Sequence, residues 1–153
     1  MSVYGDIISA MKDVLDAAPY SGSPRPTVRV RKSPQIEDSD TSFPLVILVA
    51  DPDSGDSEQE VTFTRDILYR YPFLVAIATK GNRTNEFSGT NLHEVREWAR
   101  STLNKVALTG ASSVIDTTVK MLPSFSPDTG RPGTNFDVSG LLVEYLSQEV
   151  RTA

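Results

Sequence analysis

The run FPLVILVAD occupies residues 43–51 and is apolar up to its final aspartate. Leucine, valine and isoleucine fill its centre, so it lacks the alternation of a strand that has one wet face. A continuous run of this kind is typical of a strand that is buried on both faces. We therefore expect a central strand of a β-sheet at this position.

The segment before it, TVRVRK at residues 27–32, alternates between apolar and basic residues. Val28 and Val30 would face one side of a strand and the basic side chains the other. This predicts a basic strip on one strand face, formed by Arg29, Arg31 and Lys32. The simplest interpretation is a solvated face, and the alternative is a patch for a negatively charged neighbour.

Residues 61–80 also have strand character, because they alternate at their start and are apolar at 73–78. Pro72 lies inside this segment and cannot donate a hydrogen bond to a neighbouring strand. We therefore expect a bulge, a break or a sheet edge near Tyr71.

Two more strands are predicted towards the end of the sequence. Residues 113–122 are rich in β-branched side chains, and residues 136–150 alternate, with Leu141, Val143 and Tyr145 on one side. Gly140 interrupts the second pattern, which suggests a bulge or a close approach of the backbone there.

Two segments have helical periodicity. Apolar residues recur every three or four positions over residues 3–18, and Pro19 ends that pattern. Residues 91–107 form the clearest helix, with Gly110 as its stop. Its apolar stripe consists of Leu92, Val95, Trp98, Ala99, Leu103 and Val106. Because Trp98 matches this spacing, we interpret it as a core residue and not as a platform for a ligand.

The order of these elements predicts an α+β fold. We expect a mostly antiparallel sheet of about five or six strands, since most connections are short. The N-terminal helix and the amphipathic helix at about 91–107 would pack on this sheet. A chain of 153 residues is expected to form a single domain, residues 1–153.

Composition excludes several kinds of site. The chain has no cysteine and one histidine, His93, so thiolate chemistry, disulfides and histidine-cluster metal sites are excluded. A formal net charge of −5 argues against a general nucleic-acid binder. The start lacks the pattern of a secretory signal, and the longest apolar run is too short to cross a bilayer. We therefore expect a soluble protein that is made inside a cell and does not bind a membrane.

The acidic decapeptide DPDSGDSEQE, residues 51–60, resembles a cation-binding loop only superficially. An EF-hand loop that began at Asp51 would need a carboxylate at its fifth position, a glycine at its sixth and a glutamate at its twelfth. Those positions hold Gly55, Asp56 and Thr62. We therefore interpret the decapeptide as a solvated hairpin loop, with a cation site or an acidic contact surface as the alternative.

No catalytic signature is present in the sequence. His93 falls in the first turn of the predicted helix and is interpreted as a partly exposed residue near the cap, because a general base needs a partner within hydrogen-bond reach and the neighbouring Glu94 would point elsewhere on the helix. The TKGNRT segment after the strand at 61–80 is not a phosphate-binding loop, because GxxxxGK[ST] is absent. The chain is expected to have no enzymatic activity, cofactor or metal.

The order and size of these elements resemble the tail terminator or tail completion proteins of tailed bacteriophages, and the related neck proteins. The similarity rests on an amphipathic N-terminal helix, a sheet, the helix NLHEVREWARSTLNKV, and a strand and Pro/Gly loop before FDVSGLLVEYLSQEV. It covers most of the chain, although it includes no diagnostic motif.

The resemblance implies a structural protein of the virion, assembled in the host cytoplasm. Such proteins form rings, usually hexameric, at the head-proximal end of the tail tube. They end tube polymerisation and contact the tail tube protein and the head connector or neck proteins, while DNA passes through as cargo. The long loops at 51–60, 80–90 and 124–135 would be the contact or lumen elements. Their candidate residues are Asp51, Asp53, Asp56, Glu58, Glu60, Lys80, Arg83 and Arg131.

Three alternatives stay open at this level. The chain could be a neck or tail-tube subunit of the same particle, and a tube subunit would stack into long tubes by itself. It could be a non-viral intracellular binding or adaptor module, which would be monomeric. It could also be a hydrolase that binds a divalent cation at Asp51, Asp53 and Asp56, which a thermal shift with Ca²⁺ or Mg²⁺ would reveal.

Overall fold

The computed structural model has an α+β fold, as predicted. It describes residues 2–22, 24–37, 39–50, 58–62, 66–80, 91–122 and 136–150. The elements in chain order are α1 (Val3–Ala17), β1 (Thr27–Arg31), β2 (Leu45–Val49), β3 (Glu58–Thr62), β4 (Asp66–Lys80), α2 (Asn91–Leu103), β5 (Val114–Leu122) and β6 (Phe136–Val150). Neither of the described helices is long and apolar enough to cross a bilayer.

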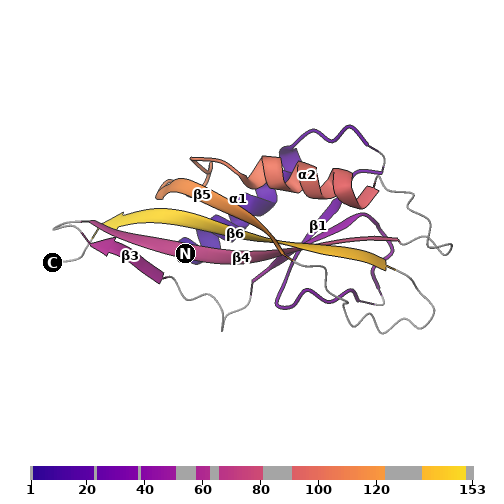
Figure 1. Cartoon of the computed structure of the whole chain (residues 1–153), viewed down its shortest axis with the longest axis horizontal. Helices are drawn as coiled ribbons and strands as arrows, with labels where there is room; N and C mark the ends of the chain where they lie inside the picture. The colour runs from indigo at the N-terminus through magenta and orange to yellow at the C-terminus, as the bar shows by residue number, and fades with distance from the viewer. Residues whose placement is uncertain are drawn as a thin grey trace.

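A long antiparallel strand pair, β4 with β6, is the spine of the sheet (Figure 1). The two strands pair over their whole length of 15 residues each, from Asp66 opposite Val150 to Lys80 opposite Phe136. The strand order is β1-β2-β4-β6-β5, and β3 also pairs with β4. Only β1 and β2 are parallel among the described pairs, which confirms a mostly antiparallel sheet.

The continuous apolar run becomes β2, and all five of its residues are buried. Val46 and Leu48 join the main core on the helix side, whereas Leu45 and Ile47 pack on the opposite side with Ala76. The prediction of a strand buried on both faces is therefore confirmed. On that opposite side, Phe43 and Ile36 from the β1–β2 connection pack against the sheet.

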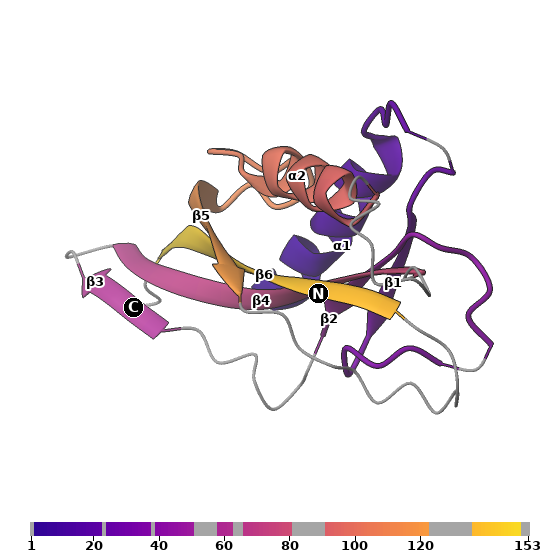
Figure 2. The ribbon, with the colours of Figure 1, turned by 45° about the vertical axis from the view of Figure 1, so that its right-hand side comes forward.

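The main core lies between the sheet and the helices α1 and α2, which cover the same face (Figure 2). The largest fully buried side chains there are Ile7, Met11, Leu15, Val46, Leu48, Phe73, Ile77, Leu103, Leu141 and Tyr145. The alternation predicted for the last strand is confirmed, because Leu141, Val143 and Tyr145 are all fully buried on this side. The pairing of β4 with β6 continues without a shift past Gly140, so no bulge forms there.

Helix α1 is closed at both ends by side chains. The Ser2 hydroxyl accepts a hydrogen bond from the amide of Gly5 at 3.0 Å, which caps the N-terminus. At the other end the Arg25 guanidinium donates to the carbonyls of Leu15, Asp16 and Ala18 at 2.9, 2.5 and 2.7 Å. These are the carbonyls that a helix end leaves without partners, so Arg25 replaces the usual C-terminal glycine motif.

We predict that Arg25→Ala lowers the free energy of unfolding by about 1–2 kcal/mol, because the hydrogen bonds from the charged guanidinium to the backbone carbonyls are lost at a partly exposed site. Arg25→Lys should recover only part of this loss, since an ammonium cannot reproduce the planar fork. Urea unfolding measures both variants. Arg29→Ala, at an exposed arginine of β1, is the control and should cost less than about 0.5 kcal/mol. If Arg25→Lys has the same free energy of unfolding as the unchanged chain, the planar guanidinium of Arg25 does not have the role described.

Helix α2 is shorter than predicted, since it ends at Leu103 and not near residue 107. The Leu103 carbonyl would accept from the amide of residue 107 in a longer helix. Instead it accepts from the buried Tyr145 hydroxyl and from the Lys105 amide, each at 3.0 Å. The prediction that Val106 belongs to the apolar stripe is therefore wrong, and its side chain is 72% exposed.

The predicted helix stop at Gly110 is also wrong. Gly110 has φ 93° and lies in a tight turn in which Leu108 and Ala111 pair, well beyond the helix end. A positive φ of this size favours glycine, so the residue marks that turn. Leu108 and Ala111 are both buried, and they supply the core contacts that Val106 does not make.

Burial raises the pKa of the Tyr145 phenol above its ordinary value of 10.0. The unfolded phenol ionises near pH 10, whereas the folded one stays protonated. The stability contributed by the neutral phenol is thus fully present below about pH 10 and is lost as the pH rises further. Tyr145→Phe should remove that alkaline slope and cost about 1 kcal/mol at neutral pH through the lost hydrogen bond. Urea unfolding from neutral to alkaline pH tests this, and equal slopes in both proteins would contradict it.

Pro72 lies at a local edge of β4. On the side away from β6, β3 pairs with β4 as far as Arg70, and β2 pairs from Val75 onward. Residues 71–74 therefore have no described strand on that side, while the pairing with β6 continues unbroken. Of the three outcomes predicted near Tyr71, the edge is confirmed, and a proline is tolerated at such a position.

The prediction of a hairpin loop at residues 51–60 is wrong. Strands β2 and β3 do not pair with each other; both lie along the same side of β4. Moreover, Glu58 and Glu60 belong to β3 and not to a loop. The polar and turn-forming composition of the segment predicts a connection correctly, but it cannot show that two strands share one long partner.

Candidate interaction surfaces

Most of the candidate loop residues lie outside the described part of the chain. These are Asp51, Asp53, Asp56, Arg83 and Arg131. Of the remaining three, Glu58 is opposite Arg70 in the β3–β4 ladder, and Glu60 lies where that ladder shifts its register. Lys80 is the last residue of β4, opposite Phe136, and not part of a loop. Among the described candidates, Glu58 and Glu60 therefore lie along the first part of β4 and Lys80 at its far end, so these three do not form one surface.

The predicted basic strip is interrupted by an ion pair. Arg31 donates two hydrogen bonds to the Asp40 carboxylate, at 2.7 and 2.5 Å, and the amide of Glu37 donates to the same carboxylate at 2.8 Å. Asp40 is 8% exposed. The hydrogen bond to Asp40 raises the pKa of the Arg31 guanidinium. Arg31 thus fastens the β1–β2 connection, and the exposed cations of the strip are Arg29 and Lys32.

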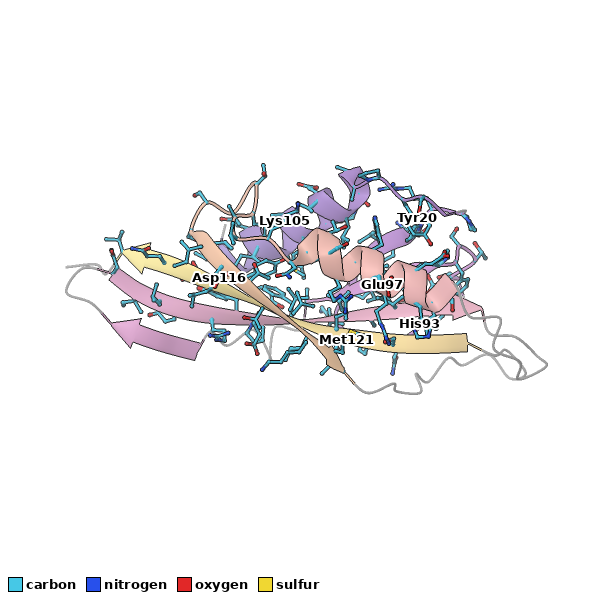
Figure 3. The ribbon with its side chains drawn as sticks, turned by 45° about the horizontal axis from the view of Figure 1, so that its top comes forward. Tyr20, His93, Glu97, Lys105, Asp116 and Met121 are labelled. Carbon is cyan, nitrogen blue, oxygen red and sulfur yellow. The ribbon has the colours of Figure 1, made fainter. Side chains whose placement is uncertain are left out.

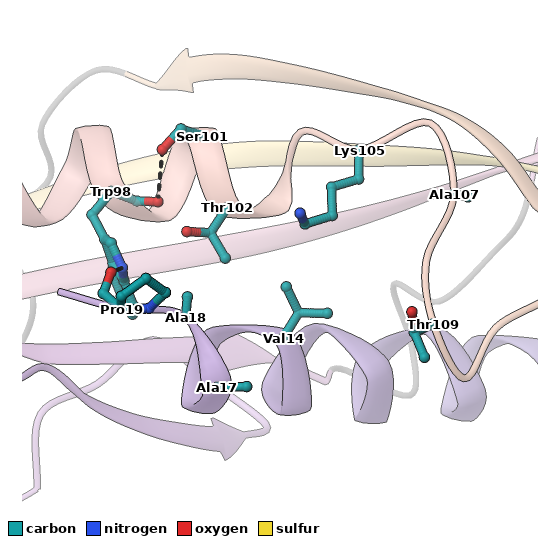
Figure 4. A pocket seen from close by; sticks show the side chains of 10 residues that line it. All are labelled: Val14, Ala17, Ala18, Pro19, Trp98, Ser101, Thr102, Lys105, Ala107 and Thr109. Carbon is teal, nitrogen blue, oxygen red and sulfur yellow. Dashed lines mark hydrogen bonds between the residues drawn. The ribbon is translucent and has the colours of Figure 1, made fainter.

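A groove lies between the C-terminal half of α1 and the side of α2 that faces it (Figure 4). It has a volume of about 640 Å³, and its walls include Val14, Ala18, Trp98, Thr102 and Lys105. The indole Nε1 of Trp98 donates to the carbonyl of Pro19 at 3.0 Å.

Trp98 is partly buried at the edge of the core, where it contacts the chain that leaves α1. Its ring meets Tyr20 edge-on at a centroid distance of 5.5 Å, and the Arg25 guanidinium lies 5.9 Å from the indole centroid. These contacts hold the end of α1 against α2. The indole therefore has a structural role at this junction, at the rim of the core and not in its centre.

The side of the sheet without helices has a row of partly exposed leucines on the spine. We call this row the leucine face; it consists of Leu68 and Leu74 on β4 with Leu142 and Leu146 on β6. Leu74 lies directly opposite Leu142. An ion pair crosses the row, from Arg70 Nη1 to Glu144 Oε2 at 2.9 Å.

A hollow of about 380 Å³ adjoins the leucine face at the local edge of β4. The residues that line it include Lys32, Val49, Pro72, Leu74 and Leu142. Its walls are mainly apolar, with one ammonium group at the side of β1. The leucine face and this hollow together form an apolar surface on the side of the sheet that α1 and α2 do not cover.

His93 is exposed at the start of α2, as predicted. On the same helix, Arg96 donates to the Ser139 hydroxyl of β6 at 3.0 Å and so ties α2 to the spine. The described residues contain no group of three histidine, cysteine, aspartate or glutamate side chains that could hold a metal. The carboxylates of the hydrolase hypothesis lie outside these residues, so that hypothesis stays untested.

Strand β5 is the end of the strand order, so its outer side is an edge among the described strands. Its exposed side chains include Ile115, Asp116, Thr118, Lys120 and Met121. Ile115 and Met121 are large apolar residues that are 43% and 42% exposed. The sequence predicts this strand correctly, but its position at the edge depends on the pairing order of the whole sheet.

A scan against protein-family models and a search of curated proteins found no match to this chain. The resemblance to phage tail proteins therefore rests on the order and size of the elements.

Proposed function

We propose that this chain is a structural subunit of a phage tail, which assembles with copies of itself into a ring at the head-proximal end of the tail tube. There it ends tube polymerisation and joins the tail to the head connector. The α+β fold and its element order support the proposal, since they match the layout that the resemblance implies.

The leucine face is the observation that carries this proposal. An apolar surface on a folded domain marks a contact with another protein, because it gains free energy when it leaves water. Here the surface lies on the longest and most regular strand pair of the sheet, which is a rigid platform for a repeated contact. A ring forms when one such surface meets a different surface of the next copy and the rotation closes.

Tube assembly in the presence of this chain tests the proposal. Subunits of the tail tube from the same particle are polymerised with increasing amounts of the chain, and tube lengths are measured by negative-stain microscopy. We expect shorter tubes, each with a ring at one end. Leu142→Lys, which places a charge on the leucine face, should abolish the shortening while circular dichroism shows an intact fold. Thr109→Lys, on the helix side, is the matched control and should act like the unchanged chain.

The other outcomes favour other classes of protein. Long tubes formed by the chain alone would identify a tube subunit. Tubes of unchanged length, with a chain that is monomeric at every concentration, would favour an adaptor module and contradict the proposal.

A further inference from the structure

The edge strand β5 has a sequence that is complementary to itself in one antiparallel register. Its residues read VIDTTVKML from Val114 to Leu122. If two copies pair about a two-fold axis at Thr118, each residue faces the one equally far from Thr118 on the other strand. Asp116 of one copy then faces Lys120 of the other, and this ion pair occurs twice.

The charges and the faces of the sheet agree with this register. Asp116 and Lys120 are opposite Leu146 and Leu142 of β6, so their side chains leave the same face of the sheet. Both are exposed, and no described carboxylate lies within ion-pair distance of Lys120. Figure 3 shows Asp116 and Met121 towards opposite ends of β5. Opposite charges that face each other across strands stabilise the pairing, whereas like charges oppose it.

The backbone of β5 has hydrogen-bonding groups for a second strand. The amide of Thr117 donates to the Asp116 side chain at 2.8 Å, so it does not bond to β6. Alternate amides of a strand point the same way, so the Val119 amide also points outward. In the two-fold register Thr117 faces Val119 of the other copy, and these residues can exchange backbone hydrogen bonds on both sides of the axis.

From these observations we infer that two copies of this chain associate through β5, antiparallel and centred on Thr118, to form a sheet that continues across the two-fold axis. The contact between Asp116 and Lys120 sets the register. An exposed edge of this kind is a template for another strand. The shift in the β5–β6 pairing between Val114 and Asp116 ends the regular edge on one side, which confines the contact to the segment around Thr118.

This contact is distinct from the ring contact and does not depend on it. A two-fold contact uses the same surface on both copies and stops at two, whereas a ring needs two different surfaces. The β5 pair is therefore the expected state of the chain away from the tail tube.

Charge reversal tests the pairing. The mass of the unchanged chain, measured by sedimentation equilibrium over a wide range of concentration, should approach twice that of one chain. Asp116→Lys and Lys120→Asp should each weaken the association about tenfold, because two attractive pairs become repulsive. The double variant that carries both changes should restore it, since each pair is then attractive again.

A cysteine at the axis tests the register directly. The chain has no cysteine, so Thr118→Cys introduces a single thiol. Residues that face each other in an antiparallel pair have Cα atoms about 4.5–5.5 Å apart, which a disulfide can span. Under a mild oxidant this variant should form a covalent dimer rapidly. Thr109→Cys, which is exposed on the turn before β5, is the control and should not.

Each outcome decides the inference. A dimer that is weakened by the single reversals, restored by the double change and cross-linked at Thr118 supports it. A chain that is monomeric at every concentration overturns it. A dimer whose association is unchanged by the charge reversals also overturns it. A larger ring that ignores the reversals also overturns the β5 pairing but leaves the proposed function standing. A β5 dimer that never caps tubes would contradict the proposed function and leave the β5 pairing intact.

Discussion

Replacing Phe73 with alanine is expected to lower the free energy of unfolding by about 3–5 kcal/mol. Phe73 is 2% exposed and lies at the centre of the spine, beneath α1. Its ring stacks on Tyr4 at a centroid distance of 4.8 Å and meets Tyr145 edge-on at 6.1 Å. The alanine variant loses the buried ring and leaves a cavity between the first helix and the sheet.

Urea unfolding followed by tryptophan fluorescence measures this loss. Since small domains have total stabilities of about 5–15 kcal/mol, the variant should be partly unfolded under mild conditions. Phe73→Leu is the matched control and should lose distinctly less, because it keeps most of the apolar volume. A loss below about 1 kcal/mol for the alanine variant would show that α1 does not pack on the spine as described.

Asp40→Asn is expected to lower the free energy of unfolding by about 3 kcal/mol. The Arg31 side chain is 15% exposed, and its two strong hydrogen bonds go to the Asp40 carboxylate. The amide cannot balance the guanidinium charge, and among the described residues the nearest other carboxylate oxygen, on Glu37, is 3.9 Å away. The cost arises because a largely buried charge loses its partner.

Two comparisons separate this effect from a general sensitivity to charge. Asp16→Asn breaks the exposed pair with Lys12, whose side chains are 47% and 39% exposed, and should cost less than about 1 kcal/mol. Replacing both members of the buried pair, as Arg31→Met with Asp40→Leu, should recover most of the stability. If Asp40→Asn costs no more than Asp16→Asn, the buried pair does not fasten the connection between β1 and β2.

Local patterns in the sequence predict most of the elements, because burial on one or both faces leaves a periodicity that can be read directly. The strands β2, β5 and β6 and the start of α2 are examples. The end of α2 is different, since a hydroxyl on Tyr145, distant in the sequence, takes the carbonyl that the next turn would need. No pattern near residue 107 carries that information.

Pairing order is the second limit. The acidic segment at 51–60 has the composition of a turn, yet it joins two strands that share one side of β4. Pro72 lies at the gap between those two strands. It predicts from the sequence that β4 has an edge there, but not which strands flank the gap. The basic strip is likewise visible in the sequence. The ion pair that neutralises Arg31 is not, because Asp40 reaches it only through the path of the β1–β2 connection.

The candidate surfaces also depend partly on the sequence and partly on the strand pairing. The complementary order of charges in β5 is present in the sequence, but it gains meaning only when β5 is known to be an edge. The leucine face needs the β4–β6 register, which places Leu74 opposite Leu142. Asp51, Asp53, Asp56, Arg83 and Arg131 lie outside the described residues, so their roles stay predictions.

Imaging of labelled tails tests whether this chain binds the end of a tail tube, as we propose. Thr109→Cys supplies one exposed thiol in a chain without cysteine, and a gold particle attached there marks the chain in negative-stain images of purified tails. Gold is expected at the head-proximal end and nowhere else. Gold along the whole tube, or tails without any gold, would contradict it.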